Sequence, residues 1–249
     1  MSGHSKWSQI KRQKGVADSR RGAVFTKLGR EITVAAKQGG GDPDANFRLR
    51  LAIQRGRDSN MPSEVIDRAV KRGAGDSDAA ELQEITYEGY GPGGTAILVD
   101  VLTDNRNRTA AELRATFTRA GGNLGEPGSV AWQFENHGVI TVNAGGAEAE
   151  KVELAAIDAG AEDVKSEDGV VEIITAPADL ETVRRVLVET KVPIASAEPS
   201  MVAKTTIDLG DREAEQVLRL LDRLEELDDV QRVHSNAEFS DAVLAGLQG

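Results

Sequence analysis

The chain has 249 residues, of which 39% are hydrophobic, and it carries a formal net charge of −11 at pH 7 and no cysteine. This length exceeds what one hydrophobic core usually serves, so we expect two or three small domains. The lack of cysteine excludes disulfides, thiolate zinc sites and cysteine nucleophiles, and it favours a cytoplasmic protein. No apolar run approaches the roughly 18 residues of a membrane span, so we expect no membrane partner.

The charge is divided very unevenly along the chain. Residues 1–75 carry 16 Lys or Arg against 7 Asp or Glu, whereas residues 76–249 carry 14 against 34. Cations concentrated in this way indicate a polyanionic partner, because an even distribution would serve solubility better.

Residues 1–22 are expected to form a mobile basic arm, since glycines interrupt them and few large apolar side chains are present. The cations of this arm suit contacts with phosphates, and Trp7 or His4 is available to stack on a base. The alternative is a solubilising tail whose Trp7 packs on the helices that follow.

Residues 23–75 are predicted to form a basic three-helix domain. Apolar spacing indicates helices that begin at Val24, after Asp42-Pro43 and after Asn60-Met61-Pro62, the last of them ending at Gly73. The polar positions of the last two helices carry seven cations, which are Arg48, Arg50, Arg55, Arg57, Arg68, Lys71 and Arg72. These side chains would bind phosphate, remain solvated or pair with the acidic body of the same chain.

The acidic body is predicted to contain two interlocked α/β units. Strands at 96–102 and 130–134 flank a helix that begins with a capping box at Thr109–Glu112. Segments at 139–142, 147–159, 163–166, 170–175, 179–190 and 194–202 complete a ferredoxin-like βαββαβ unit. A strand at 205–209, a helix through Leu220 and a strand at 230–239 return to the first unit. Acidic pairs such as Asp228-Asp229 are interpreted as a solvated face.

The predicted fold class is therefore α+β multidomain, with an N-terminal three-helix domain followed by two ferredoxin-like α/β domains, one inserted in the other. The expected boundaries are 1–22 for the arm, 23–75 for the helices, 76–135 plus 205–249 for the discontinuous domain and 136–204 for the inserted one.

Few motifs indicate chemistry. Residues 89–94 have the glycine spacing of a dinucleotide fingerprint, but they precede a strand where that motif needs a helix, so they predict a tight turn. We expect no catalytic residue, cofactor, metal or small-molecule substrate. The loop at 104–109 places Arg106 and Arg108 beside the free amides of a helix N-terminus, which suits an anion, unless these arginines pair with neighbouring acids.

Several stretches closely resemble the YebC family, which includes the mitochondrial translational activator of cytochrome oxidase subunit I. They are GHSKW at 3–7, residues 21–41, DPDAN at 42–46, NMP at 60–62, YEGYGPGG at 87–94, LTDNRNRT at 102–109 and GGNLGEPGSVAWQF at 121–134. One departure is the Gln-Arg-Gly-Arg sequence at 54–57, where a lysine- and alanine-rich helix is expected. This departure bears on the length of the second helix and on the number of its phosphate contacts.

The resemblance implies a helical domain, two α/β domains and a non-enzymatic regulator of gene expression. Some family members are known as DNA-binding probable transcriptional regulators. The alternative is a ribosome-associated, rRNA-binding translation factor or activator that helps synthesis through proline-rich stalling sequences. An enzyme that uses the cleft between the α/β domains is a third alternative, without a recognisable catalytic constellation. No heptad repeat or large apolar patch indicates an oligomeric state.

The positions that match the basic N-terminus of the family are the expected nucleic-acid contacts, and the two arginines of the 104–109 loop are added to them. They are Lys6, Trp7, Lys11, Arg12, Lys14, Arg20, Arg21, Lys27, Arg30, Arg106 and Arg108.

Overall fold

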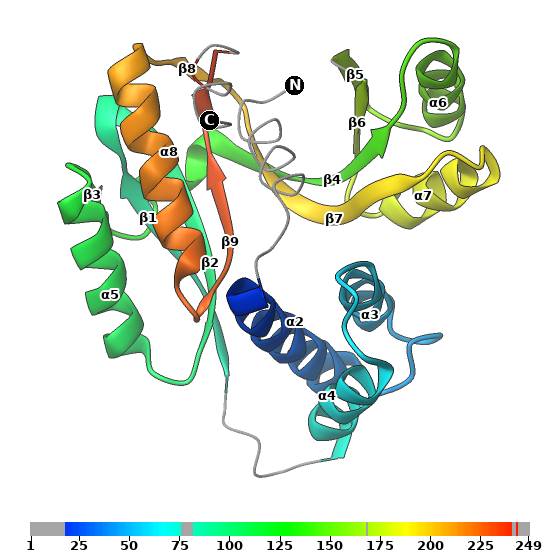
Figure 1. The fold of residues 1–249 in the computed structure, drawn as a ribbon, viewed down its shortest axis with the longest axis horizontal. Coiled ribbons are helices and arrows are strands. Elements are labelled where there is room, and N and C mark those ends of the chain that lie inside the picture. The colour runs from blue at the N-terminus through cyan, green and yellow to red at the C-terminus, as the bar shows by residue number, and fades with distance from the viewer. Residues whose placement is uncertain (1–17, 76–81, 168, 241–242, 244–249) are drawn as a thin grey trace.

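The computed structural model describes residues 18–75, 82–167, 169–240 and 243 (Figure 1). Three helices form one part, and two four-stranded antiparallel sheets, each with two helices, form the others. This is the predicted α+β multidomain class. The predicted arm lies outside the described residues as far as position 17.

The helical part contains α2 (Asp18–Gly39), α3 (Phe47–Asp58) and α4 (Ser63–Gly75). Its core includes Leu28, Ile32, Leu49, Ile53, Met61 and Ile66. Asn46 caps α3 by accepting from the Leu49 amide at 3.1 Å, and its Nδ2 donates to the Ala35 carbonyl of α2 at 2.8 Å. Two predicted boundaries are wrong, because α2 already begins at Asp18 and α4 continues to Gly75.

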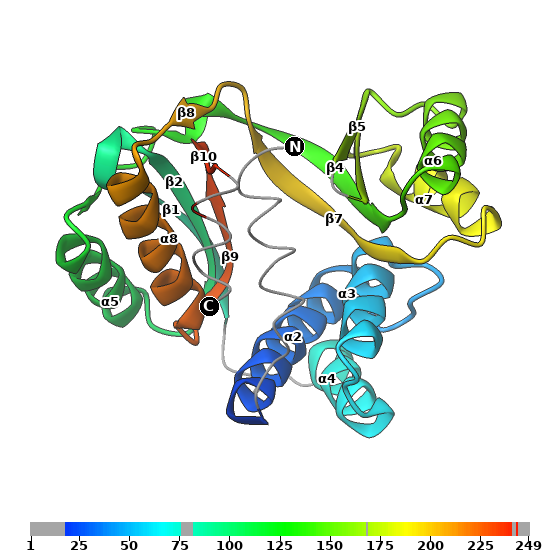
Figure 2. The ribbon, with the colours of Figure 1, turned by 45° about the horizontal axis from the view of Figure 1, so that its top comes forward.

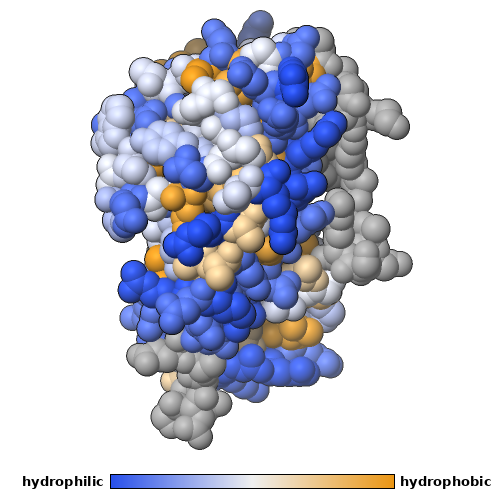
Figure 3. Space-filling view, turned by 90° about the vertical axis from the view of Figure 1, so that its left-hand side faces the viewer, coloured by the Kyte–Doolittle hydropathy of each residue, from blue (hydrophilic) through white to orange (hydrophobic). Residues whose placement is uncertain are grey.

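The first sheet has the order β3-β1-β2-β9. Its strands are β1 (Gln83–Tyr90), β2 (Ala96–Thr103), β3 (Asn123–Leu124) and β9 (Val230–Ser235). Helices α5 (Arg106–Arg119) and α8 (Asp211–Glu226) cover one face and bury Leu113, Phe117 and Leu221 against Ile97 and Val233. The outer surface on this side is mostly hydrophilic (Figure 3). The turn η1 (Pro92–Gly94) joins β1 to β2, as the glycine-rich segment predicted.

The chain order of this unit differs from the prediction, because a β1–β2 hairpin precedes α5. The predicted strand at 130–134 is also wrong, since a 3-10 turn, η2 (Ala131–Gln133), occupies most of it. The cause is the buried carboxylate of Glu88, which accepts from the amides of Val130 at 2.7 Å and Ala131 at 2.8 Å. Burial alone would raise the pKa of Glu88, but these backbone donors lower it overall.

Two further predictions of local structure are wrong. Helix α5 begins at Arg106 and is capped by Asn105, which accepts from the Arg108 amide at 3.1 Å, so Thr109 and Glu112 form no capping box. The strands expected at 205–209 and 230–239 are shorter. Within these two segments, β8 (Ile207–Asp208) and β10 (Ala237–Glu238) pair in parallel and form a separate two-stranded sheet.

The second sheet has the order β5-β6-β4-β7, with every pair antiparallel, which confirms the ferredoxin-like unit. Its elements are β4 (Phe134–Asn143), α6 (Ala147–Asp158), β5 (Asp163–Glu167), β6 (Val170–Thr175), α7 (Leu180–Glu189) and β7 (Ile194–Ala203). Pro199 lies in the edge strand β7, as expected. Because β9 belongs to the first sheet, the second sheet is inserted in the chain of the first.

Apolar contacts join the three parts. Phe134 of β4 and Met201 of β7 pack with Leu98 on the face of the first sheet that α5 and α8 leave open. Leu51 and Phe47 of α3 pack on the core of the second sheet. The helical part consequently lies beneath both sheets (Figure 2).

Candidate nucleic-acid interface

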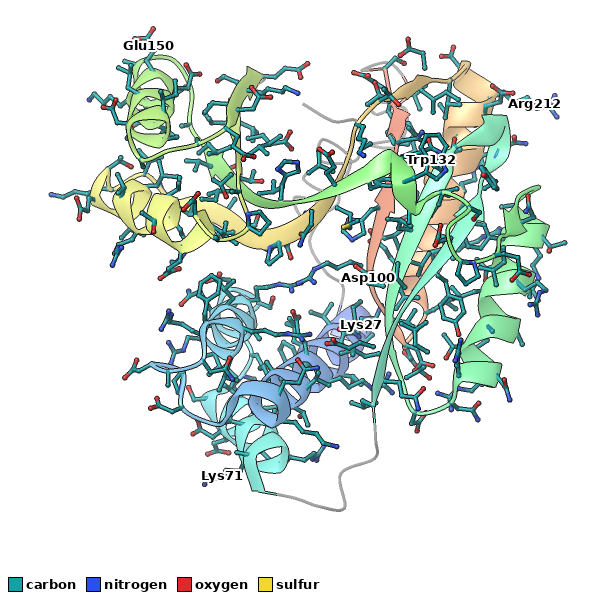
Figure 4. All side chains as sticks on the ribbon, turned by 180° about the vertical axis from the view of Figure 1, so that it is seen from behind. Lys27, Lys71, Asp100, Trp132, Glu150 and Arg212 are labelled. Carbon is teal, nitrogen blue, oxygen red and sulfur yellow. The ribbon has the colours of Figure 1, made fainter. Side chains whose placement is uncertain are left out.

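Two of the predicted nucleic-acid contacts fix α2 to the first α/β domain. Lys27 Nζ donates to the carbonyl of Glu225 at the end of α8 (Figure 4). Arg30 Nη1 donates to Asp229 Oδ1 at 2.8 Å and to the carbonyl of Asp228 at 3.0 Å. These side chains therefore hold α2 against the turn between α8 and β9.

Asp229 is the centre of this contact, and its carboxylate is almost completely buried. Oδ2 accepts from Thr109 Oγ1 at 2.7 Å, Arg108 Nη2 at 2.9 Å and Thr103 Oγ1 at 3.1 Å. Burial alone would raise the pKa of Asp229, but its bonds from Thr109, Arg108 and Arg30 lower it to about 2. The interpretation of Asp228-Asp229 as a solvated pair is therefore wrong for Asp229.

The two arginines of the 104–109 loop have different surroundings. Arg108 pairs with Asp104 at 2.8 Å and with Asp229 at 2.9 Å. For this arginine the structure therefore shows the second predicted alternative, which is pairing with acids. The hydrogen bonds that Arg108 donates to Asp229 and Asp104 raise the pKa of its guanidinium group. The Arg106 side chain is exposed and makes no hydrogen bond or ion pair with the described residues.

A second charge cluster joins all three domains. Glu31 of α2 accepts from Arg55 of α3 at 2.8 Å and from Arg232 of β9 at 3.0 Å. Glu198 of β7 contacts Arg232 Nε at 3.3 Å and Arg55 Nη2 at 3.4 Å. Burial alone would lower the pKa of Arg232, but Glu198 and Glu31 raise it overall. The charge of Arg55 is thus neutralised inside the molecule.

The remaining cations of the helical domain fall into two groups. Arg48 pairs with Glu84 of β1, and Arg50 lies 3.9 Å from Glu181 of α7, so both face the acidic body. Among the described residues of the helical domain, five cations have exposed side chains that form no ion pair or hydrogen bond, and they are Lys37, Arg57, Arg68, Lys71 and Arg72. Internal pairing therefore accounts for one group, and the other faces solvent.

Two of these unpaired cations line a groove of about 420 Å³ between α2, α4 and the β2–α5 loop. Arg68, Arg72 and Arg30 supply its charge, and Phe25 and Val65 supply apolar surface. Asp104 also lines it but is already bound to Arg108. We call this the arginine groove. Arg106 follows Asp104 by two residues, and Lys71, labelled in Figure 4, lies beside Arg72 on α4.

The other predicted contacts lie outside what the structure describes. Lys6, Trp7, Lys11, Arg12 and Lys14 precede the described residues, and Arg20 and Arg21 are described only as backbone in the first turns of α2. Phe25 is not among the predicted contacts, and no local signal distinguishes it from the other apolar residues of the helix that is predicted to begin at Val24.

One polar constellation is formed by the buried His234 with a half-buried serine and a half-buried aspartate. His234 Nε2 lies 3.0 Å from Asp100 Oδ2, and its Nδ1 lies 3.4 Å from Ser200 Oγ. The serine contact is longer than an ordinary hydrogen bond. Burial would raise the pKa of Asp100, but the hydrogen bond to His234 lowers it. We interpret the constellation as a cross-link between β2, β9 and β7.

Among the described residues, no group of His, Cys, Asp and Glu could hold a metal ion. None of the helices described is long and apolar enough to span a membrane.

Two family models cover nearly the whole chain. The model of the TACO1/YebC protein N-terminal domain matches residues 5–76, and that of the TACO1/YebC second and third domain matches residues 82–237. This chain belongs to the TACO1/YebC family. The boundary between the two matches falls between α4 and β1, where the helical part of this YebC-family protein gives way to the first sheet.

Full-length relatives are named as probable transcriptional regulatory proteins. That of Chloroflexus aurantiacus is 53% identical over 248 residues, which are 98% of each chain. That of Moorella thermoacetica is 54% identical over 247 residues, again 98% of each chain. A solved structure of a conserved hypothetical protein from Aquifex aeolicus is 44% identical, with a TM-score of 0.84 over 90% of this chain and 93% of the other.

Proposed function

We propose that this YebC-family protein is a non-enzymatic, cytoplasmic regulator of gene expression that binds nucleic acid through the arginine groove. The supporting observation is that the side chains of Arg68 and Arg72, which line the groove, are exposed and form no ion pair or hydrogen bond with the described residues, and the same holds for the side chains of Lys71 and Arg106. Arg30, Arg55 and Arg108, by contrast, are paired with carboxylates. Free guanidinium groups gathered at one groove suit the oxygens of phosphate.

The binding is expected to depend mainly on phosphates. The exposed polar residues of α4 include Glu64, Asp67, Arg68, Lys71 and Arg72, without the Asn and Gln that commonly read base edges. Phosphate contacts fix the position of a protein on nucleic acid but carry little sequence information. The names of the relatives make DNA the first target to test, and rRNA on the ribosome is the second.

Salt dependence tests the proposal directly. Anisotropy of a labelled DNA duplex, titrated between about 50 and 200 mM salt, is expected to give a slope of log K against log salt of about −5 to −7. This corresponds to about six to eight phosphates neutralised by the four exposed cations named above together with the basic residues of 1–22. Replacing both Arg68 and Arg72 by Gln should weaken binding and reduce the slope by about 2. The matched control replaces Arg114 and Arg119, two exposed cations of α5 outside the groove, and should bind like the wild type. A slope near zero would contradict the proposal.

Sedimentation of a cell lysate separates the two targets. Migration with ribosomal particles that RNase abolishes would make rRNA the partner. A protein that stays at the top of the gradient in both samples, together with duplex binding in vitro, would support DNA.

A further inference from the structure

A second and larger groove, of about 850 Å³, lies between the helical part and the second sheet. Helices α2 and α3 form one wall, and α7 with the edge strand β7 forms the other (Figure 2). Phe25, Leu28 and Ile194 are among its apolar residues, and Lys191, Asn60 and Gln54 are among its polar ones. We call it the interdomain groove. Phe25 lines both this groove and the arginine groove, so α2 is the ridge between them.

Two helices end at this groove in the left-handed backbone conformation. Asn60, with φ of 58°, follows α3, and Lys191, with φ of 62°, follows α7. They are the only residues other than glycine with positive φ in the described chain. At the same position after α5 and α6 the chain has glycine, namely Gly121 and Gly160, with φ of 82° and 98°. A Cβ disfavours this conformation, so glycine is the usual residue there. Two side chains are therefore placed over the groove where a glycine would be less strained.

The charge available in the groove is positive. Lys191 is exposed and has no ion pair or hydrogen bond from its ammonium group within the described residues. Of the two acids in the lining, Glu198 pairs with Arg232 at 3.3 Å, and Asp58 accepts from the neutral amide of Gln54 at 2.8 Å. Arg184 also lines the groove, but its guanidinium group is paired with Glu181 at 2.9 Å. An occupant would thus meet an apolar floor with the ammonium group of Lys191 at its edge.

We propose that the interdomain groove binds a stretch of single-stranded nucleic acid, with a base against Phe25 and phosphate on Lys191. An aromatic side chain beside cations is the composition of single-strand sites, where bases stack and the backbone follows positive charge. A duplex keeps its bases stacked inside the helix and cannot present one to the floor of this groove. The side-chain amide of Asn60 offers both a donor and an acceptor to a base edge. This inference rests on the proposed function and extends it across α2.

The test uses the full chain and two labelled probes, an oligouridylate of about 12 nucleotides and a duplex of the same length. The single strand is expected to bind more tightly than the duplex in the same buffer. Lys191→Gly should weaken single-strand binding severalfold and reduce the salt slope by about 0.7, as for one lost phosphate contact. Because glycine suits a positive φ, this variant should melt at or above the wild-type temperature.

Phe25→Leu distinguishes stacking from charge. It keeps an apolar side chain and should weaken single-strand binding about fivefold or more, with the salt slope unchanged. Lys151→Gln is the matched control for charge, because Lys151 is an exposed cation of α6 that lines neither groove. It should bind like the wild type.

The outcomes separate this inference from the proposed function. If the wild type binds neither probe, the proposed function fails with it. A second outcome is that the wild type binds and the Arg68 and Arg72 variant loses affinity, while Lys191→Gly and Phe25→Leu bind normally. The proposed function would then stand, and the inference that the interdomain groove binds a single strand would be overturned. Equal losses in Lys191→Gly and Lys151→Gln would show an effect of net charge alone and would also overturn it.

Discussion

Asp229 is the residue on which the contact between the helical domain and the first sheet depends. Its carboxylate binds Arg30 of α2 and Arg108 of α5, and two threonine hydroxyls complete its partners. Nothing in the local sequence predicts this set of partners for Asp229. Arg30 and Asp229 are 199 residues apart, so their pairing exists only in the folded chain. The sequence alone predicts phosphate for Arg30, either an anion or a neighbouring acid for Arg108, and solvent for Asp229.

Replacing Asp229 by Asn should lower the free energy of unfolding by about 1–3 kcal/mol, because the arginines lose their carboxylate and the threonine hydroxyls lose a charged acceptor. Urea denaturation at neutral pH measures this. Asp104→Asn, which removes the exposed partner of Arg108, is the control and should cost less than about 0.5 kcal/mol. Equal urea midpoints for Asp229→Asn and the wild type would contradict the role given to this residue.

The same residue predicts part of the acid sensitivity. The pKa of Asp229 falls to about 2 in the folded chain, below its ordinary value of 3.8. A carboxyl with a depressed pKa stabilises the fold above its unfolded pKa, so this contribution is lost as the pH falls from about 4 toward 2. Asp229→Asn should lack that part of the pH dependence, whereas Asp104→Asn should retain it.

Helices α2 and α4 cross at Gly73, which the sequence suggested as a helix terminator. The residue lies inside α4, and a Cβ built on it would come within 2.2 Å of the Thr33 carbonyl oxygen and 2.7 Å of the Ala36 Cβ. The absence of a side chain at Gly73 is therefore what allows the two backbones to approach.

Gly73→Ala should destabilise the helical domain by about 2 kcal/mol or more, although alanine normally favours a helix over glycine by up to about 1 kcal/mol. Gly75→Ala, in the last turn of the same helix, is the control, because apart from the adjoining chain no atom of the described residues lies within 4 Å of an added Cβ, and it should be neutral or slightly stabilising. Thermal unfolding followed by circular dichroism compares them. A Gly73→Ala variant as stable as the wild type would show that the helices can separate without loss.

Elements with a clear apolar pattern were predictable, and those set by distant groups were not. The buried strands β2 and β6 are apolar runs interrupted by Asp100 and Glu172 and ended by a threonine, and the sequence predicts both. Strand β1 was missed because its sequence, QEITYEGY, mixes exposed polar residues with glycine. Residues 130–134 have a strand-like composition. The carboxylate of Glu88, more than 40 residues earlier, nevertheless takes the Val130 and Ala131 amides and bends the chain there.

At the scale of the whole molecule, the uneven charge has two uses. Part of the basic surface docks the helical domain on the acidic body, through the pairs of Arg30, Arg48 and Arg55. The rest faces solvent at the arginine groove. The sequence showed the division of charge and the insertion of one α/β unit in the other. It could not divide the cations between the two uses, because that depends on which carboxylates the fold brings within reach.

The docking should be measurably electrostatic at the cluster of Glu31, Arg55, Glu198 and Arg232. Arg232→Gln leaves two half-buried carboxylates facing Arg55, and Glu198→Gln leaves two arginines facing Glu31, so each single change should cost about 2–4 kcal/mol. The double variant removes one charge of each sign. It should therefore be less destabilised than the sum of the singles, with a coupling energy of about 1–3 kcal/mol in a urea-denaturation cycle.

The matched control for this cycle is the pair of Arg219 and Glu215 on α8, which are 3.3 Å apart with 68% and 55% of their side chains exposed. Water screens such a pair, so the same cycle should give a coupling of about 0.3–0.5 kcal/mol. If the central cycle were as small as this one, apolar contacts such as those of Leu51 and Phe47 would be sufficient to hold the helical domain in place. A large central coupling together with faster hydrogen exchange along α2 in Arg232→Gln would instead identify the ion cluster as the contact that fixes the domain arrangement.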